Sequence, residues 1–527
     1  MTTPTVSTPI RVSRFARELS HYDPVSKRYL LEGLTLGFKI GYDGPIISVT
    51  SKNLKSASSH PDVVDKYLKE EVSLGRIKGP FPNQPFPIFR INPLGIVPKK
   101  TVGKFRAILN LSAPPGKSVN EFINKEDFKL QYTKVDTAID FILSLGRGCM
   151  LSKVDIQDAF RILPVSPEDW YLLGMEWKGK FYHDCRLTMG SRSSPYIFDC
   201  VSSALEWICK HNYEVEYICH LLDDFLAAES VTDKGNALSV ICNIFSWLGV
   251  PLAPQKIFGP VTSLEFLGIL LDTVDFVASL PLDKVNALIG KLEYALSRRK
   301  LTKRELLSLI GSLSFACKVV VPGRSFLSRL ITLSCTVREL HFKVYLTKNV
   351  KADMRLWVEF LRSWNGRNFF LQRSIEKSVD LDFSTDACSE VGYGGFITGE
   401  WFGGSWRGSQ FSWSMPCMEL FPILVSVCIW KNKFCNKRVL VRCDNASTVQ
   451  VINKGYTNKE PAASMLREIA RQAMYGNFLI KAEHIPGKDN VFADLISRQR
   501  LDEFFGLCSY AQIEPCIIPD FLLNFAS

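Results

Sequence analysis

Two adjacent aspartates interrupt an apolar run at residues 220–226, which reads His-Leu-Leu-Asp-Asp-Phe-Leu. Burying one carboxylate among leucine and phenylalanine is costly, and burying two neighbours costs more because their like charges repel. A divalent cation would neutralise the pair. The run therefore predicts a hairpin between two hydrophobic strands that presents Asp223 and Asp224 to a metal ion beside a phosphate. A solvated surface turn is the alternative, because aspartate also favours turns.

Length and composition indicate a multidomain globular protein. The chain has 527 residues, which is more than one hydrophobic core supports. Hydrophobic residues make up 46% and charged residues 22%, as in folded chains. The net charge of +11 suits a polyanionic partner such as nucleic acid, although ordinary surface charge would give the same number.

Cysteine usage and the N-terminus indicate an intracellular protein, in the cytoplasm, the nucleus or both. The 15 cysteines are scattered, and the polar N-terminus lacks the apolar segment of a signal peptide. No Cys-x-x-Cys occurs, which argues against a structural zinc site. No apolar stretch is long enough to cross a bilayer without an interrupting charge, so no membrane partner is expected.

Changes of pattern divide the chain into five segments and predict an α+β / α/β multidomain fold. Residues 1–75 read as a partly flexible N-terminal extension with little core of its own. Strands and helices alternate over 76–278, and amphipathic, basic helices occupy 279–375. A second strand-rich pattern fills 376–500, and 501–527 is an apolar tail broken by prolines.

Several local elements follow from periodicity. Apolar residues at helical spacing predict helices over 61–74 and 283–298. The run Thr-Lys-Arg-Glu at 302–305 is typical of a capping box and predicts the start of another helix. A strand over 105–111 should pair with 94–98 across a basic loop.

A third carboxylate can join the aspartate pair. Asp155 ends an apolar strand and is followed by a turn, so it can share one sheet face with Asp223 and Asp224. Two-metal nucleotidyl transfer needs such a set of ligands, because one ion activates a hydroxyl and the other holds a triphosphate. Asp158 lies on the following turn and is expected to be solvated.

Further motifs follow in the order found in reverse transcriptases, and the chain resembles that family. They are the glycine-containing run at 187–195 and the runs at 249–256 and 264–268. The resemblance implies right-hand polymerase fingers and palm over 76–278 and a helical thumb and connection over 279–375. It also implies RNA-directed and DNA-directed DNA synthesis, with an RNA template, a DNA primer and dNTPs as partners.

The resemblance also assigns roles to residues. The catalytic carboxylates would be Asp155, Asp223 and Asp224, and these together with Ile156 would bind two Mg²⁺ or Mn²⁺ ions. The expected dNTP-binding residues are Lys99, Arg106, Phe160, Gly190 and Lys256. Phe160 matches the aromatic ring that excludes a ribose 2′-hydroxyl, and core packing is its alternative fate. Leu221 stands where the family usually has tyrosine, which affects fidelity or rate rather than metal binding.

A narrower resemblance is to DIRS-like retroelements, and gypsy-like LTR elements come next. It rests on the runs at 153–161 and 167–175 and on the histidine before the hairpin. Such elements pair a reverse transcriptase and an RNase H with a tyrosine recombinase. A tyrosine recombinase and a gag-like protein of the same element are therefore further expected partners.

A second set of acids lies toward the end of the chain. Each member stands at a strand end or helix start: Asp386, Glu419, Asp444 and Asp494. Four such carboxylates can converge on two divalent ions. Their order, with the run His-Ile-Pro-Gly at 484–487, resembles retroelement RNases H. The resemblance implies an RNase H-like α/β domain over 376–500 that cleaves the RNA of an RNA–DNA hybrid, again with two ions.

The leading hypothesis is therefore a retrotransposon enzyme with polymerase and RNase H activities. The alternative is a decayed or co-opted copy that binds nucleic acid without catalysis, but none of the seven carboxylates is missing. A domesticated polymerase of the telomerase or maturase type would explain the first site and leave the second unexplained.

Overall fold

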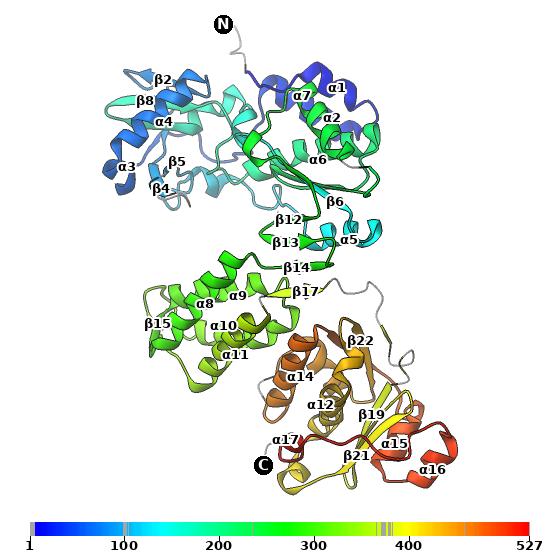
Figure 1. The fold of residues 1–527 in the computed structure, drawn as a ribbon. Coiled ribbons are helices and arrows are strands. Elements are labelled where there is room, and N and C mark those ends of the chain that lie inside the picture. Colours follow the sequence, from blue (N-terminus) through cyan, green and yellow to red (C-terminus); the bar gives the residue numbers. More distant parts are fainter. Residues whose placement is uncertain are drawn as a thin grey trace. The chain divides into compact units, whose positions relative to one another are not determined.

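Strands and helices are interleaved along the whole chain in the computed structural model (Figure 1). The chain divides into two units, Met1–Leu267 (unit 1) and Gly268–Ser527 (unit 2). Both units mix helices with strands, which confirms the expected multidomain α+β class. The structure describes residues 6–98, 103, 105–233, 235–364, 366–369, 376–377, 381, 383–457 and 459–525.

Apart from β12, the described strands of unit 1 form three sheets. They are a five-stranded sheet of order β1-β3-β7-β8-β2, a four-stranded sheet of order β11-β6-β10-β9, and the hairpin β4-β5. The strands of unit 1 are β1 (Val49–Thr50), β2 (Ile77–Phe81), β3 (Arg90–Ile91), β4 (Leu94–Pro98), β5 (Phe105–Leu109), β6 (Met150–Asp155), β7 (Gly174–Trp177), β8 (Lys180–Asp184), β9 (Ile218–Leu221), β10 (Asp224–Glu229), β11 (Phe258–Val261) and β12 (Ser263–Phe266).

The predicted hairpin between 94–98 and 105–111 is confirmed, with one end shorter. β4 and β5 are antiparallel, and their register runs from Leu94 opposite Leu109 to Pro98 opposite Phe105. The second strand stops at Leu109 because Asn110 turns the chain. The Asn110 side chain accepts a hydrogen bond from the Ser112 amide at 3.0 Å, a turn geometry that asparagine favours.

Three helices of unit 1 pack on its four-stranded sheet. The helices of the unit are α1 (Val12–Glu18), α2 (Pro24–Leu36), α3 (Lys55–Ser59), α4 (Pro61–Ser73), α5 (Val135–Leu145), α6 (Ser194–Tyr213) and α7 (Asn236–Leu248). α5, α6 and α7 pack against its strands (Figure 1). The helix predicted over 61–74 is confirmed as α4.

The N-terminal segment belongs to the core of unit 1. Phe15 and Leu19 are fully buried, and Leu30 and Leu34 are nearly so, all in one cluster with residues of the four-stranded sheet. The sequence had predicted a partly flexible extension with little core of its own. Its helices instead supply apolar side chains to the shared core, which the polar composition of residues 48–59 obscured.

Unit 2 begins with a mainly helical part. Its elements are β13 (Ile269–Asp272), β14 (Val277–Ser279), α8 (Leu282–Ser297), β15 (Lys300–Thr302), α9 (Lys303–Ala316), α10 (Ser328–Ser334), β16 (Lys343–Tyr345), α11 (Lys348–Trp364) and β17 (Arg367–Phe369). The predicted amphipathic helix is α8. The predicted capping box opens α9: the Thr302 hydroxyl accepts from the Glu305 amide at 3.2 Å, and the Glu305 carboxylate accepts from the Thr302 amide at 2.7 Å.

The rest of unit 2 is an α/β arrangement. Two sheets have the orders β19-β20-β21 and β18-β22-β23, and β19 lies next to β22. The elements are β18 (Glu376–Lys377), β19 (Phe383–Cys388), β20 (Gly392–Ile397), β21 (Glu400–Ser405), α12 (Met415–Phe434), β22 (Arg438–Cys443), α13 (Ala446–Lys454), α14 (Ala462–Gly476), β23 (Leu479–His484), α15 (Val491–Ser497), α16 (Leu501–Leu507) and α17 (Asp520–Leu523).

Helices α12 and α15 cover opposite faces of the β19-β20-β21 sheet. Tyr393 on β20 packs edge-on against Phe421 of α12. The next residue, Gly394, faces α15, where an added Cβ would lie 2.5 Å from Ile496. Successive strand residues point to opposite faces, so the two helices sandwich the sheet. Glycine at 394 allows the close approach of α15.

The C-terminal tail, which the sequence left unassigned, follows the edge strand β21. The amides of Gln512 and Cys516 donate to the carbonyls of Gly399 and Trp401 at 2.8 and 2.7 Å. The Trp401 indole donates to the Gln512 carbonyl at 2.7 Å, and Leu522 of α17 is fully buried. Within the described ranges, no helix has the length and apolar character needed to span a membrane.

Candidate active sites

The first candidate site lies where strands β6 and β10 of unit 1 meet. Asp155 ends β6, Asp224 begins β10, and the two residues are directly opposite each other in the antiparallel register. Asp223 occupies the turn between β9 and β10, and its carbonyl accepts a hydrogen bond from the Ile156 amide at 2.9 Å. The three carboxylates predicted from the sequence are therefore brought together by one strand pair and its turn.

Crowding and burial perturb the acids of this first site. Burial raises the pKa of Asp223, and the negative charge of Asp155 raises it further. Burial also raises the pKa of Asp224, while a hydrogen bond from Lys153 lowers it. One oxygen of Asp224, Oδ1, is buried without a hydrogen-bond partner among the described residues. Such a site favours a bound cation, because positive charge would relieve both the repulsion and the unpaired oxygen.

Two lysines supply part of that positive charge. Lys153 Nζ lies 2.9 Å from Asp224 Oδ2, and Lys256 Nζ lies 2.7 Å from Asp155 Oδ2. Lys256 was expected among the dNTP-binding residues, and its ammonium here contacts a carboxylate. Lys153 was not anticipated as a site residue. Its position two residues before Asp155 on the same strand is the signal that could have revealed it, because alternate strand residues share a face.

The backbone of Leu222 and the contacts of His220 constrain the turn that carries Asp223. Leu222 has a φ of 55°, which is uncommon for a non-glycine residue and carries strain. On β9, His220 contacts two carboxylates of α6, with Nδ1 2.5 Å from Glu206 and Nε2 3.4 Å from Asp199. Burial alone would lower the pKa of His220, but these two contacts outweigh it and raise the pKa to about 9.

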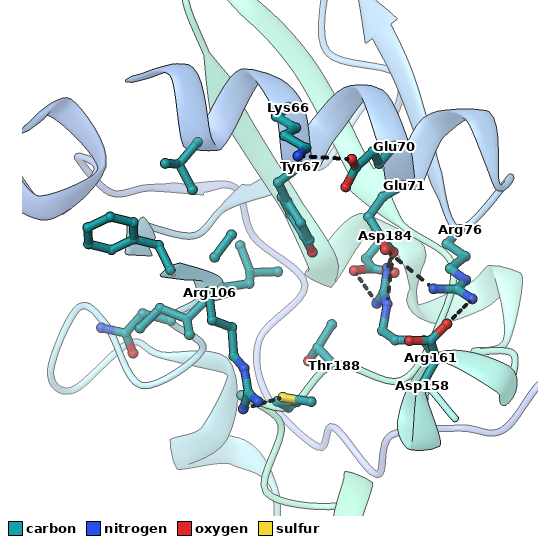
Figure 2. Close-up of a pocket in the computed structure, with 18 of the residues that line it drawn as sticks. Lys66, Tyr67, Glu70, Glu71, Arg76, Arg106, Asp158, Arg161, Asp184 and Thr188 are labelled. Atoms are coloured by element: carbon teal, nitrogen blue, oxygen red, sulfur yellow. Dashed lines mark hydrogen bonds and ion pairs between the residues drawn. The ribbon is translucent and has the colours of Figure 1, made fainter. Parts of the chain in front are cut away.

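A cleft of about 970 Å³ lies in unit 1 between α4, β5 and residues 184–190 (Figure 2). The exposed Arg106 points into it from β5, with Nη1 3.5 Å from the Met189 sulfur. Gly190 lines the same cleft and touches β5 so closely that an added Cβ would lie 2.2 Å from the Leu109 carbonyl oxygen. Lys99, the other expected triphosphate ligand, lies outside the described residues.

Phe160 follows Asp155 on the short 3-10 helix η2 (Ala159–Ile162). Its ring is half-buried and meets Phe198 of α6 edge-on, at 5.3 Å between centroids. Core contact and partial exposure therefore coexist at this position. Asp158, expected to be solvated, is exposed but pairs with Arg76 at 2.7 Å.

The second candidate site lies at the C-terminal α/β part of unit 2. Its four predicted acids come from four elements: Asp386 from β19, Glu419 from α12, Asp444 from the end of β22, and Asp494 from α15. Asp386 feels the charges of both Asp444 and Asp494, and Glu419 feels those of Asp386 and Asp444. The structure therefore brings all four into one cluster.

Burial dominates the electrostatics of this second cluster. It raises the pKa of Glu419 to about 9, with the charges of Asp386 and Asp444 adding to the effect. It raises the pKa of Asp386 to about 6, although a hydrogen bond from the Ser497 hydroxyl at 2.6 Å opposes the shift. Asp494 is paired with Arg498 at 2.7 Å. Buried acids with raised pKa values fit a site that binds divalent cations.

A cysteine joins the second cluster unexpectedly. Ligand atoms of Glu419, Cys443 and Asp444 all lie within 4.8 Å of one another. Burial raises the pKa of the Cys443 thiol to about 12, so oxygen atoms remain the ligands suited to Mg²⁺. His484 ends β23, and its Nε2 lies 2.9 Å from the Asp444 carbonyl oxygen. That contact is with the backbone beside the site.

The solved structures that match the chain include foamy viral protease-reverse transcriptases. The one in complex with dsDNA has 16% identity and a TM-score of 0.48, and it covers 92% of this chain and 99% of the other. The dRH form in complex with ds DNA has 15% identity and a TM-score of 0.47, with coverages of 92% and 83%. The complex with RNA/DNA hybrid has 14% identity and a TM-score of 0.47, with coverages of 92% and 64%.

Sequence comparison finds a match to a family model over one part of the chain. No curated protein sequence matches the chain. Residues 97–271 match the family model described as reverse transcriptase (RNA-dependent DNA polymerase). This range contains all three acids of the first site and ends before α8. Over residues 97–271 the chain is therefore similar to reverse transcriptases.

Proposed function

We propose that this chain is an RNA-directed and DNA-directed DNA polymerase that also degrades the RNA of RNA–DNA hybrids. The observation that carries the polymerase assignment is the cross-strand pair of Asp155 and Asp224 beside Asp223, within the range that matches reverse transcriptases. The RNase H assignment is supported by the four-acid cluster of unit 2.

Each site would work with two divalent ions, Mg²⁺ or Mn²⁺. In the first site Asp155, Ile156, Asp223 and Asp224 would hold them, and the buried, unpartnered Oδ1 of Asp224 supports this fit. Bound metal lowers the pKa of the attacking hydroxyl and neutralises charge on the phosphates. The carboxylates of this chain would fix the ions, and Lys153 and Lys256 would orient Asp224 and Asp155.

The cleft of unit 1 would receive the incoming dNTP. Arg106 would bind the triphosphate together with Lys99, because an exposed guanidinium can donate to phosphate oxygens in pairs. Gly190 would let backbone approach the nucleotide, and the partly exposed ring of Phe160 would exclude a 2′-hydroxyl. Lys256 would exchange its contact with Asp155 for the departing pyrophosphate.

In the second site Asp386, Glu419, Asp444 and Asp494 would hold two ions that activate a water molecule for attack on RNA. Burial of Asp386 and Glu419 keeps their pKa values high until cations arrive, so the site would load metal and release protons together. The Ser497 hydroxyl would orient Asp386, and Arg498 would orient Asp494.

The proposed organisation follows from these sites. Fingers and palm would occupy 76–278, a helical thumb and connection 279–375, and an RNase H-like domain 376–500, flanked by the extension 1–75 and the tail 501–527. We place the chain among DIRS-like retroelements. It would act inside the cell on an RNA template, a DNA primer and dNTPs, alongside a tyrosine recombinase and a gag-like protein of the same element.

One primer-extension assay tests both activities. It uses primed RNA and DNA templates plus a labelled hybrid, with Mg²⁺ or Mn²⁺. Asp223→Asn should abolish dNTP incorporation and spare hybrid cleavage, whereas Asp444→Asn should do the reverse. Unchanged incorporation in the Asp223 variant would refute the polymerase site. Tight hybrid binding with no turnover in either metal would instead identify a decayed, nucleic-acid-binding copy.

A further inference from the structure

A buried ion cluster forms one wall of the cleft in unit 1 (Figure 2). Arg161 lies at its centre. Its Nη2 lies 2.6 Å from Glu71 Oε2, and its Nη1 lies 2.7 Å from Asp184 Oδ2. Arg76 reaches the other oxygen of Glu71 at 3.4 Å and also contacts Asp158. The side chains of Arg161 and Glu71 are each 12% exposed, and that of Asp184 is 2% exposed.

Arg161 is fully engaged by the protein. All three of its guanidinium nitrogens donate: Nε and Nη2 to Glu71, and Nη1 to Asp184. Asp184 is satisfied as well, because its second oxygen accepts from the Arg186 amide at 2.9 Å. Nη1 also donates to the Leu187 carbonyl at 3.4 Å, so four of the five N–H groups of Arg161 are engaged within the protein. Arg161 therefore acts mainly by anchoring the backbone around it, whereas Arg106 is exposed to the cleft.

The cluster ties three separate segments together. Glu71 is on α4, Asp184 ends β8, and Arg161 belongs to η2, directly after Phe160. Removing one partner of a buried ion pair leaves an uncompensated charge, so such a pair resists small displacements. The backbone of η2 is consequently held in a fixed position relative to α4 and β8, and Phe160 is held with it.

We propose that Glu71 and Asp184 are positioning residues that hold Arg161 and thereby fix the Phe160 ring, so that they determine how strictly the cleft selects a deoxyribose over a ribose. This inference rests on the proposed polymerase function. It assigns to helix α4 a share in sugar selection, exerted through the position of η2.

The chain offers a matched control on the same helix. Glu70 precedes Glu71, carries the same charge and is 60% exposed, with Lys66 Nζ 3.9 Å away. Exposed pairs of this kind contribute little to stability. Glu70→Gln removes the same charge from the neighbouring position of α4, which also lines the cleft, and it leaves the contacts of Arg161 in place.

The test compares the full-length protein with its Glu71→Gln, Glu71→Asp and Glu70→Gln variants. Single-nucleotide extension gives kcat and KM for each dNTP and the matching rNTP. Binding of the same nucleotides to a complex with a dideoxy-terminated primer is measured in parallel. Thermal melts followed by circular dichroism identify folded variants, and Glu71→Asp, which keeps the charge, supplies the measurement if Glu71→Gln does not fold.

We expect Glu71→Gln to lower the preference for dNTP over rNTP by about tenfold, mainly through KM, because sub-ångström displacement of a positioning group has effects of this size. Glu70→Gln should match the wild type. A purely structural role would lower kcat and the melting temperature and leave the sugar preference unchanged, which would overturn the inference. If no nucleotide is incorporated by the wild type, the polymerase proposal fails, and the binding preferences still decide the inference.

Discussion

The pairing of His220 with two buried carboxylates makes unit 1 sensitive to pH in the alkaline range. His220 is 8% exposed, and its contacts with Glu206 and Asp199 raise its pKa from 6.5 to about 9. A pKa raised in the folded state gives stability that is complete below pH 6.5 and is lost as the pH rises through 9. A shift of this size corresponds to about 3 kcal/mol, because each pKa unit is worth about 1.4 kcal/mol.

Replacing His220 with glutamine should remove that contribution. At pH 6 the free energy of unfolding should fall by about 3 kcal/mol relative to the wild type, and the difference should shrink steadily between pH 6.5 and 9. Urea denaturation followed by tryptophan fluorescence at several pH values measures both quantities. Losing the two ion pairs of residue 220 should also make the strand that leads into the Asp223 turn more mobile. The rate of dNTP incorporation should therefore decline in this variant.

The control is His211→Gln. His211 is exposed at the end of α6, stacks on Trp207 and has no carboxylate partner among the residues that the structure describes. That variant should keep the pH dependence of the wild type. A destabilisation by His220→Gln that is equal at pH 6 and pH 9.5 would show that His220 contributes by packing alone, and the reasoning from its charge would be wrong.

Three further predictions concern other elements. Gly190→Ala should destabilise unit 1 and raise the KM for dNTP, because the new Cβ would lie 2.2 Å from the Leu109 carbonyl oxygen. Gly290→Ala, on α8 where a Cβ meets open space, should instead raise the free energy of unfolding by up to about 1 kcal/mol. Denaturant titrations measure both changes in stability. Thr302→Ala should lower the free energy of unfolding by about 1 kcal/mol through loss of the α9 cap, measured in the same way. Adding Mg²⁺ to protein stripped with EDTA should raise the melting temperature, because the cation relieves repulsion between the acids of the second cluster. Asp444→Asn should reduce that rise. An equal rise in both proteins would show that the metal binds elsewhere.

Elements with a local signature could be predicted from the sequence. The α9 cap and the β4-β5 pairing depend on residues a few positions apart, so their geometry follows from short-range rules. The acids of the first site were predictable because burying adjacent carboxylates is unfavourable without a cation. Only the cross-strand register, which needs the fold, places Asp155 opposite Asp224.

Features that depend on distant contacts could not be predicted. The sequence around Glu71 does not predict its ion pair with Arg161, because 90 residues separate the two along the chain. The burial of Phe15 in the core and the contact of Lys256 with Asp155 are of the same kind. Asp158 looked solvated because its partner, Arg76, lies in a different segment of unit 1.

The tail along β21 has a practical consequence for anyone who shortens this chain. Ending the chain at residue 500, after the last candidate acid, would remove the hydrogen-bonding partners of the Gly399 and Trp401 carbonyls. The outermost strand would then present unsatisfied backbone groups that invite another molecule to add a strand. Shortened protein should therefore self-associate and precipitate although all seven candidate acids are present, and its inactivity would reveal nothing about the chemistry.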